Sequence, residues 1–383
     1  MAHKKGVLLL GSYGQTNLGD DLLMWNYLEL LGKKDFKRIY VNVSTKALIP
    51  QIIREKYPDI EIVETYRTSM RSWIRILRSV ECAVYGGGTI YKELYASTGR
   101  SKYSVIRRLL AFNWLARFMG VKVYHLNIGI GSLRTWRGRM ITKWALTAAT
   151  YSVFRDDESY KFALARLGIS ERKVCSSTDG LFLNPIWQKP WRPARLPATR
   201  KKYKAVVGIN ALSDIPDWVN REKYITAMRR FVQRLLDAGV YVVFLPFQHA
   251  FNPRNDLVFM QEEIVAPLGK PANLHVVQEV PLEQASSYMR QFDVFVGMRF
   301  HSLLLAAANA TPFVAIAYDT KCWRFIEEAN YPHAVKIEDL TFKKLIQTYN
   351  NALGQRKTSA KQLQAVAADN FKEAHQCLRR LHF

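Results

Sequence analysis

Short runs of consecutive apolar residues alternate along the chain with segments of helical length. The apolar runs have the length of buried strands and lie at Gly6–Leu10, Ile39–Val43, Cys82–Tyr85, Val121–Ile128, Ala205–Ile209, Tyr241–Phe247, Leu274–Val277, Asp293–Val296 and Pro312–Tyr318. The helix-length segments include Asp21–Leu31, Glu158–Leu167, Arg221–Ala238, Leu282–Phe292 and Ser302–Ala310. Apolar strands that alternate with helices are typical of parallel sheets covered on both faces. The pattern predicts an α/β fold.

One segment interrupts this alternation. The stretch "NPIWQKPWRPARLPATRKK", Asn184–Lys202, contains four prolines and several basic residues and has no clear period. A chain of 383 residues is longer than one core usually is. We therefore expect an N-terminal domain at 1–183, a Pro-rich linker at 184–204 and a C-terminal domain at 205–383 that ends in a helix, Thr358–Leu381. Two Rossmann-like domains facing each other would form a cleft where the strands end.

The charge is large and unevenly distributed. The chain has 56 Lys and Arg against 32 Asp and Glu, a net charge of +24. Between Arg67 and Lys143 only Glu81 and Glu93 are acidic. Such a field attracts nucleic acid, anionic lipid, or an anionic glycan or diphosphate. The stretch Arg100–Lys122 predicts a basic amphipathic helix, which suits a membrane interface and equally an outer helix of an α/β domain.

The cysteines and the N-terminus indicate a cytoplasmic protein. No CxxC pair occurs among Cys82, Cys175, Cys322 and Cys377, and three of the four have apolar or amphipathic neighbours, so buried thiols are expected there. A reducing compartment fits this pattern. The start "MAHKKGVLLLGSYG" does not resemble a signal peptide. No uncharged run reaches the ~20 residues that span a bilayer. The protein is expected to be soluble or to lie on a membrane surface.

Two glycine-rich loops follow predicted strands in the N-terminal half. The first, "GSYGQTNLGDD" at Gly11–Asp21, is neither a GxGxxG fingerprint nor a P-loop, but it leads into a helix whose N–H groups can face an anion or a sugar. One of Asp20 and Asp21 is expected to cap that helix, and the other to face the cleft as a base. The second, "VYGGGTIYKE", contains Gly87 and Gly88 and fits either a ligand approach or a tight turn.

Basic side chains follow three other predicted strands. Arg155 in "FRDDES" either bridges to the acids that begin the next helix or binds an anion. Arg299 and His301 follow one strand in "VGMRFHS", and Lys321 follows the next strand in "AYDTK". Parallel strands joined by one helix usually lie side by side, so the last three side chains are expected to converge on a phosphate or carboxylate. No metal is predicted, because His301 has no second ligand at a suitable spacing.

The stretches "GSYGQTNLGDDLLM", "YGGGTIYKE", "FRDDES", "FLPFQ" and "VGMRFHSLLLAAANATPFVAIAYDTK" resemble the polysaccharide pyruvyl transferases, in order from near Gly11 to about Phe325. The resemblance implies a GT-B-like fold and transfer of the pyruvyl group of phosphoenolpyruvate to two hydroxyls of a sugar, with release of phosphate. It implies that Arg155, His301 and Lys321 line the donor site with Arg299 beside them, and that Asp20 matches the acidic residue of the first loop. The endings "QTNLGDD" and "SSTDG" depart from the family pattern.

The chemistry of this transfer assigns a role to each candidate. His301 or a water molecule organised by Arg155 would protonate the donor, and His301 is favoured because an imidazole titrates nearest neutrality. Asp20 would accept a hydroxyl proton. Arg155, Arg299 and Lys321 would hold the donor's anionic groups. The acceptor side is expected in the N-terminal domain, with Gly14, Asn17, Gly87 and Gly88 as substrate-binding positions. No cofactor is expected besides the donor.

The expected partners are phosphoenolpyruvate and a glycan or lipid-linked sugar acceptor. If the acceptor is lipid-linked, the basic region would bring the enzyme to an anionic membrane surface, the inner face of the plasma membrane. One alternative is a GT-B glycosyltransferase that uses a nucleotide-sugar. The other is a basic protein that binds nucleic acid or an anionic glycan; because no RNA-binding signature or recognition helix is found, nucleic acid is not expected as a partner.

Overall fold

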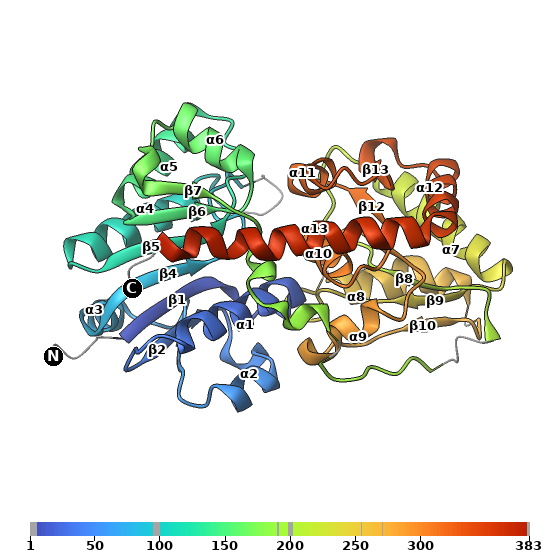
Figure 1. The fold of residues 1–383 in the computed structure, drawn as a ribbon, viewed down its shortest axis with the longest axis horizontal. Coiled ribbons are helices and arrows are strands. Elements are labelled where there is room, and N and C mark those ends of the chain that lie inside the picture. The colour runs from blue at the N-terminus through green and yellow to red at the C-terminus, as the bar shows by residue number, and fades with distance from the viewer. Residues whose placement is uncertain are drawn as a thin grey trace. The chain divides into compact units, whose positions relative to one another are not determined.

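The computed structural model describes residues 6–94, 100–189, 191–197, 202–253, 255–269 and 271–380, which form two compact units. The first unit contains residues 6–15, 20–183 and 370–380, and the second contains residues 16–19 and 184–369. Both are α/β units with a parallel sheet, which confirms the predicted fold class (Figure 1).

The first unit contains seven strands, which are all paired in parallel in the order β3-β2-β1-β4-β5-β6-β7. Its elements are β1 (Gly6–Tyr13), α1 (Leu18–Gly32), β2 (Ile39–Val43), α2 (Gln51–Lys56), β3 (Glu61–Glu64), α3 (Met70–Ser79), β4 (Val80–Gly86), α4 (Ser104–Phe118), β5 (Lys122–Ile128), α5 (Trp136–Ala148), β6 (Tyr151–Phe154), α6 (Asp157–Ala165) and β7 (Val174–Ser176). The strand order reverses between β1 and β4, where the two glycine-rich loops begin.

The second unit has six parallel strands in the order β10-β9-β8-β11-β12-β13. Its elements are β8 (Val206–Ile209), α7 (Arg221–Asp237), β9 (Tyr241–Phe244), α8 (Asp256–Phe259), β10 (Leu274–Val276), α9 (Ala285–Met289), β11 (Val294–Gly297), α10 (Phe300–Ala308), β12 (Phe313–Ala317), α11 (Thr320–Glu328), β13 (Ala334–Lys336), α12 (Phe342–Gly354) and α13 (Arg356–Gln376). Here the strand order reverses between β8 and β11. In open parallel sheets ligands bind outside the carboxyl ends of the strands at such a reversal.

Apolar burial and helix caps explain why these segments adopt these elements. In the first unit, side chains of α3, α4, α5 and α6 pack with strand residues in one buried cluster. A second cluster fills the other unit, where α7 and α12 cover the sheet. Seven helices begin after a residue whose side chain accepts a hydrogen bond from the first turn, namely Ser69, Thr135, Asp156, Asn220, Asn255, Asp319 and Thr341.

The domain boundaries differ from those predicted in three places. Residues 16–19 of the first loop group with the second unit, and residues 370–380 of the last helix group with the first. The predicted linker is not a free connection, because Trp187 is buried and its carbonyl oxygen accepts a hydrogen bond from Ser286 Oγ. Ala194 N also donates to Ser287 Oγ. Residues 190, 198–201 and 381, which belong to the predicted linker and last helix, lie outside the described part.

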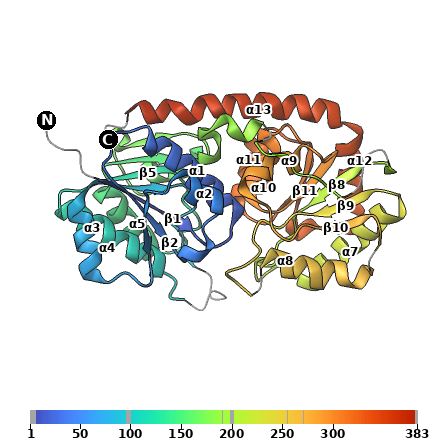
Figure 2. The same ribbon diagram turned by 90° about the horizontal axis from the view of Figure 1, so that it is seen from below.

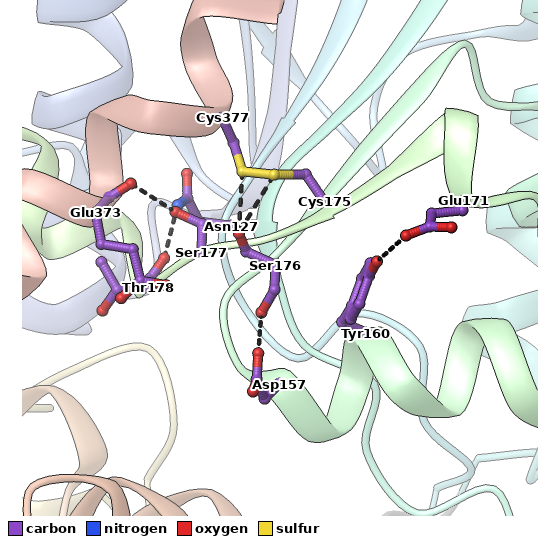
Figure 3. The surroundings of a disulfide bond; sticks show 10 residues. All are labelled: Asn127, Asp157, Tyr160, Glu171, Cys175, Ser176, Ser177, Thr178, Glu373 and Cys377. Atoms are coloured by element: carbon purple, nitrogen blue, oxygen red, sulfur yellow. Dashed lines mark hydrogen bonds between the residues drawn. A yellow bond between two sulfur atoms is a disulfide. The ribbon is translucent and has the colours of Figure 1, made fainter.

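The cysteines also differ from the prediction. Cys82 and Cys322 are buried thiols, as expected, and burial raises the pKa of Cys82 to about 12. Cys175 and Cys377, however, form a disulfide (Figure 3). The end of α13 brings Cys377 to β7, with the two Cα atoms 6.3 Å apart, which is within the range that a disulfide spans. A separation of 202 residues hides this pairing from the sequence.

Candidate active site

In the second unit, the reversal of strand order brings together residues that follow β8, β9 and β11. Asn210, directly after β8, accepts a hydrogen bond from Arg299 N at 3.1 Å, and its amide donates to Leu245 O at 3.2 Å. Arg299 immediately precedes α10, so its side chain starts from the carboxyl edge of the sheet. The predicted placement of Arg299 at a strand end is therefore correct.

The Arg299 guanidinium pairs with a carboxylate that the sequence analysis missed. Its Nε donates to Asp256 Oδ2 at 2.9 Å, and its Nη2 donates to Asp256 Oδ1 at 2.7 Å and to Gln248 Oε1 at 3.0 Å. Asp256 is fully buried, whereas the Arg299 side chain is 18% exposed. A two-point contact of this kind fixes the plane of the guanidinium. In the sequence, Asp256 follows a helix-capping Asn255 and carries no signal of its own.

His301 lies against the first glycine-rich loop, at the start of α10. The Thr16–Gly19 segment runs antiparallel to the chain after β9, with Leu18 N donating to Phe247 O at 2.8 Å and Asn17 bridged to Gln248. At residue 19 a Cβ atom would overlap the His301 imidazole, so only glycine allows this approach. Part of the predicted acceptor loop therefore belongs to the second unit together with His301.

Thr16 holds a conformation that β-branched residues rarely adopt. Its φ is 51°, in the left-handed region, where a β-branched residue is a true outlier. Its Oγ1 accepts a hydrogen bond from Ala250 N at 3.0 Å, which helps to hold the strained residue in place. Strain of this kind persists where surrounding contacts impose it, often at functional sites.

Lys321 lies close to His301 through Phe300. The ammonium group is 5.9 Å from the Phe300 ring and 5.7 Å from the Tyr318 ring. It also pairs with Asp319 Oδ2 at 3.0 Å. Burial raises the pKa of Asp319, but the charge of Lys321 and the hydrogen bonds from Cys322 and Lys321 outweigh it and lower the pKa below its usual value. Because β11 pairs with β12, Arg299, His301 and Lys321 all follow strands that end side by side at one edge of the sheet.

In the first unit, Arg155 lies at the end of β6 and is almost completely buried. Its Nη1 donates to Asp179 Oδ2 at 3.1 Å, and its Nη2 donates to Thr89 Oγ1 at 2.5 Å. Its Nε also pairs with Asp156 Oδ2 of "FRDDES" at 4.0 Å, so the arginine bridges to an acid of its own motif and to Asp179 of "SSTDG", which the sequence had marked only as a departure from the family pattern. A Cβ at residue 129 would come within 2.9 Å of Arg155 Nε, so Gly129 makes room for this side chain.

Gly14, Gly87 and Gly88 of the first unit share a backbone conformation but differ in the space around them. Gly14, Gly87 and Gly88 have φ of 69°, 73° and 83°, which favour glycine. Gly14 also packs tightly on Thr45, and Gly87 on Leu23, whereas a Cβ at residue 88 would make only an ordinary contact with Ile90. Of the three, Gly88 has the most room for a ligand.

The acidic residues of the first loop do not cap α1. This helix begins at Leu18, and Asn17 Oδ1 accepts a hydrogen bond from Gly19 N at 3.1 Å, so Asn17 performs the capping that was predicted for an aspartate. Asp21 is buried and Asp20 is half-buried. Burial raises the pKa of Tyr13, and the charge of Asp20 raises it further, which places Asp20 near that phenol. Asp20 directly follows Gly19, the residue that contacts His301.

In the second unit the candidate residues are the His301 imidazole and two cations paired with carboxylates, Arg299 and Lys321. The first unit carries Arg155, which is paired with Asp179. In the described part of the chain, no group of three or more His, Cys, Asp or Glu side chains is placed to hold a metal ion. Among the described helices, none is both long and apolar enough to cross a membrane. Fixed guanidinium and ammonium groups beside an imidazole can orient an anionic substrate and exchange a proton with it.

Comparison with known proteins agrees with this geometry. Residues 17–320 match the family model described as polysaccharide pyruvyl transferase. No match was found among curated proteins. Similar solved structures include a protein from Listeria monocytogenes described as a UDP-N-acetylglucosamine 2-epimerase (TM-score 0.63, 14% identity, 99% of this chain and 95% of that one). Others are the UDP-GlcNAc 2-epimerase of Methanocaldococcus jannaschii (0.61, 11%, 97% and 98%) and a glycosyltransferase of Rickettsia africae (0.57, 11%, 100% and 100%). These similarities show a GT-B fold.

Proposed function

Because the chain belongs to the polysaccharide pyruvyl transferase family, we propose that it moves the pyruvyl group of phosphoenolpyruvate onto two hydroxyls of a sugar. The sugar belongs to a bacterial exopolysaccharide, capsule or cell-wall glycan precursor, and the products are a cyclic ketal and phosphate. The observation that carries the proposal is the placement of His301 beside Arg299 and Lys321 at the ends of β11 and β12.

Protonated His301 acts as the acid in this scheme. It gives its proton to the methylene carbon of phosphoenolpyruvate, and the electrons of the carbon–carbon double bond form the new C–H bond. The neighbouring carbon becomes electron-deficient, and a sugar hydroxyl attacks it and passes its proton to Asp20. Phosphate then leaves with its bonding electrons, and the second hydroxyl adds to the same carbon and passes its proton to the now neutral His301, which restores the acid. A well-placed acid or base contributes about 10²–10⁴-fold to such a step.

Arg155, Arg299 and Lys321 bind the donor's phosphate and carboxylate in the proposal. Each is oriented by an aspartate, and a cation that is already fixed loses less freedom on binding a ligand. The contacts with Asp256 and Gln248 fix the position of the Arg299 guanidinium. Phosphate gains negative charge as it leaves, so these cations stabilise the transition state as well.

Gly14, Asn17, Gly87 and Gly88 remain the proposed acceptor positions. Gly88 is supported by the room around it, whereas the contacts of Gly14, Gly87 and Asn17 are also explained by local structure. The scheme uses no metal and no cofactor other than the donor. The proposal places the enzyme in the cytoplasm, peripherally on the inner face of the plasma membrane, where a lipid-linked sugar would be presented to it.

The test is phosphate release from phosphoenolpyruvate with galactose, mannose, N-acetylmannosamine and glucose acceptors, free and lipid-linked. We expect acceptor-dependent release that falls about 10²–10⁴-fold in His301→Ala. The matched control is His375→Ala, because His375 is exposed on α13. Near wild-type turnover in His301→Ala would remove the acid role. Absence of release with every acceptor, together with tight binding of a nucleotide-sugar, would favour a glycosyltransferase instead.

A further inference from the structure

Helices α4 and α5 expose an unusual group of large apolar side chains. Nine large apolar side chains are exposed in the described part of the chain, and five of them lie on these two helices. They are Trp114, Phe118, Trp136, Met140 and Trp144, with exposures of 40%, 91%, 64%, 41% and 51%. We call this set the α4–α5 face. Scattered apolar side chains need no explanation, but a contiguous group marks an interaction surface.

The five side chains lie on one surface. Within each helix they recur every four residues, the spacing of neighbours on one side of a helix. Between the helices, Trp114 Nε1 donates to Trp144 O at 3.2 Å, and Arg117 Nη1 donates to Thr147 O at 3.2 Å. Figures 1 and 2 both show α4 and α5 close together in the first unit. The opposite sides of both helices contribute to the buried cluster of that unit.

The same two helices carry only positive charge. Neither contains an Asp or Glu, and together they contain six basic residues, namely Arg107, Arg108, Arg117, Arg137, Arg139 and Lys143. The neighbouring helix α3 contains no acid either and adds Arg71, Arg75 and Arg78. Its Trp73 contacts Phe112 of α4 edge-on, at 6.0 Å between ring centroids. Nine of the basic residues that contribute to the net charge therefore lie on the adjoining helices α3, α4 and α5.

Neighbouring arginines lower the pKa of an exposed phenol, that of Tyr66. Burial raises the pKa of Tyr66, but a hydrogen bond with Arg108 and the charges of Arg100 and Arg108 lower it below its usual value. Tyrosine is rarely acidified at a protein surface, because solvent screens most charges there. Arg100, just before α4, and Arg108, within α4, therefore act together on the exposed Tyr66 side chain.

We propose that the α4–α5 face binds the anionic surface of a lipid bilayer. Tryptophan and basic residues together are typical of helices that lie in the membrane interface, with rings among the acyl chains and cations at the headgroups. Arg117 lies 5.6 Å from the centre of the Trp114 ring, and Arg137 lies 5.5 Å from that of Trp136. Each of these two rings therefore has a cation beside it. Anionic headgroups supply the charge that this face lacks.

A nucleic acid fits the face less well. Its phosphates would match the basic residues, and bases could stack on the tryptophans. Phe118 and Met140, however, are among the exposed side chains, and Met140 offers no flat ring for stacking. An apolar bilayer interior accepts both. Membrane binding by this face does not depend on the proposed function. The further idea, that such binding delivers the enzyme to a lipid-linked acceptor, rests on that function.

The test uses the full chain and vesicles, with no donor or acceptor. We expect sedimentation with vesicles that contain phosphatidylglycerol, little sedimentation with phosphatidylcholine alone, and weaker binding as salt is added. Trp136→Ala/Trp144→Ala should bind about tenfold or more weakly. The matched control is Trp218→Ala, which removes a 58% exposed tryptophan from the second unit and should bind like wild type. Unchanged circular-dichroism melting would show that the variants fold.

A charge series completes the test. Arg137→Glu/Arg139→Glu should weaken binding by roughly fivefold or more for each charge, whereas reversal of the exposed Lys357 and Lys361 on α13 should not. The proposal is overturned if wild type ignores anionic vesicles, if the tryptophan double variant binds equally well, or if RNA displaces the vesicles. If the enzyme transfers pyruvyl groups but does not bind vesicles, only the proposal of membrane binding by the α4–α5 face is refuted. An enzyme that binds vesicles without transfer refutes the proposed function alone.

Discussion

Each cationic side chain among the candidate residues pairs with an aspartate, and Arg155 also pairs with a second one, Asp156. Arg155 pairs with Asp179, Arg299 with Asp256 and Lys321 with Asp319. Arg299, His301 and Lys321 were expected to converge on a bound phosphate or carboxylate, but the fold itself supplies carboxylates to Arg299 and Lys321. The site therefore does not attract an anion through excess charge alone. It presents oriented N–H groups, and recognition depends on their direction.

Asp256→Ala should destabilise the second unit strongly. The change leaves the mostly buried Arg299 guanidinium without its carboxylate, and removal of one partner from a buried pair costs about 3–5 kcal/mol. Urea denaturation followed by circular dichroism would measure the loss. The control is Asp339→Ala, which breaks the exposed pair with Lys344 and should cost less than about 1 kcal/mol. Equal stabilities of the two variants would show that Asp256 is not needed to hold Arg299.

Gly19→Ala should abolish most activity, although alanine usually favours a helix by about 1 kcal/mol over glycine. The new methyl group would overlap the His301 ring and displace it. Misplacement of a reacting group by about 1 Å can lower the rate about a hundredfold. Acceptor-dependent phosphate release measures the effect.

Gly32→Ala is the control for this change, because it lies in the same helix and its Cβ would meet only Tyr57 at an ordinary 3.8 Å. We expect it to keep wild-type activity. If both glycine variants were equally active, the close approach of the first loop to His301 would have no part in the reaction.

Sequence patterns predicted the site residues that follow strands and missed the aspartates that orient them. Arg299, His301 and Lys321 come directly after two apolar runs, so the geometry of a parallel sheet places them together. Asp179 lies 24 residues from Arg155, and Asp256 lies 43 residues from Arg299. The positions of these two aspartates depend on the path of the chain through the fold. A local sequence pattern does not specify that path.

Among the helices and strands, continuous apolar runs were easy to predict, whereas three of the four edge strands were not. The fourth, β10, was predicted at Leu274–Val277. β3, β7 and β13 have mixed burial and three or four residues each, so no apolar run identifies them. All three lie at sheet edges. Half-buried edge strands bury little apolar surface, and pairing with a neighbour rather than their own composition determines them. The grouping of residues 16–19 with the second unit also arises from pairing, with the chain after β9.

The end of α13 is attached to β7 by more than the disulfide. Ser177 Oγ donates to Glu373 O at 3.4 Å (Figure 3). Thr178 contacts Asn370, and the Phe182 and Phe371 rings meet edge-on. These residues directly precede and follow Asp179, the partner of Arg155. The contacts therefore brace the strand end that orients this arginine.

Thiol counting tests the disulfide. Protein purified and denatured without reductant should show two reactive thiols, Cys82 and Cys322, and four after reduction. Cys377→Ser should show three before reduction, because Cys175 loses its partner, whereas Cys322→Ser should show one. Four reactive thiols in unreduced wild type would mean that the pair is open under those conditions and that the noncovalent contacts of α13 hold it alone.

For the whole molecule, the net charge of +24 opposes folding through self-repulsion. Sodium chloride should therefore raise the unfolding temperature by screening. Phosphate at equal ionic strength should raise it further if the second-unit cations bind phosphate, because a ligand at about 100 times its Kd adds about 2.7 kcal/mol. Phosphate also stabilises proteins by exclusion from their surface, so the difference between the two salts must be compared among variants.

Lys321→Ala should lose the extra stabilisation by phosphate, whereas Lys357→Ala, at an exposed position on α13, should keep it. Both salts are measured on each variant by thermal unfolding, so any loss of stability from the substitution itself cancels. The same excess in both variants would mean that phosphate acts on the whole surface and that Lys321 holds no anion. An excess lost only with Lys321 would identify an anion site independently of catalysis, because no acceptor sugar is present in this measurement.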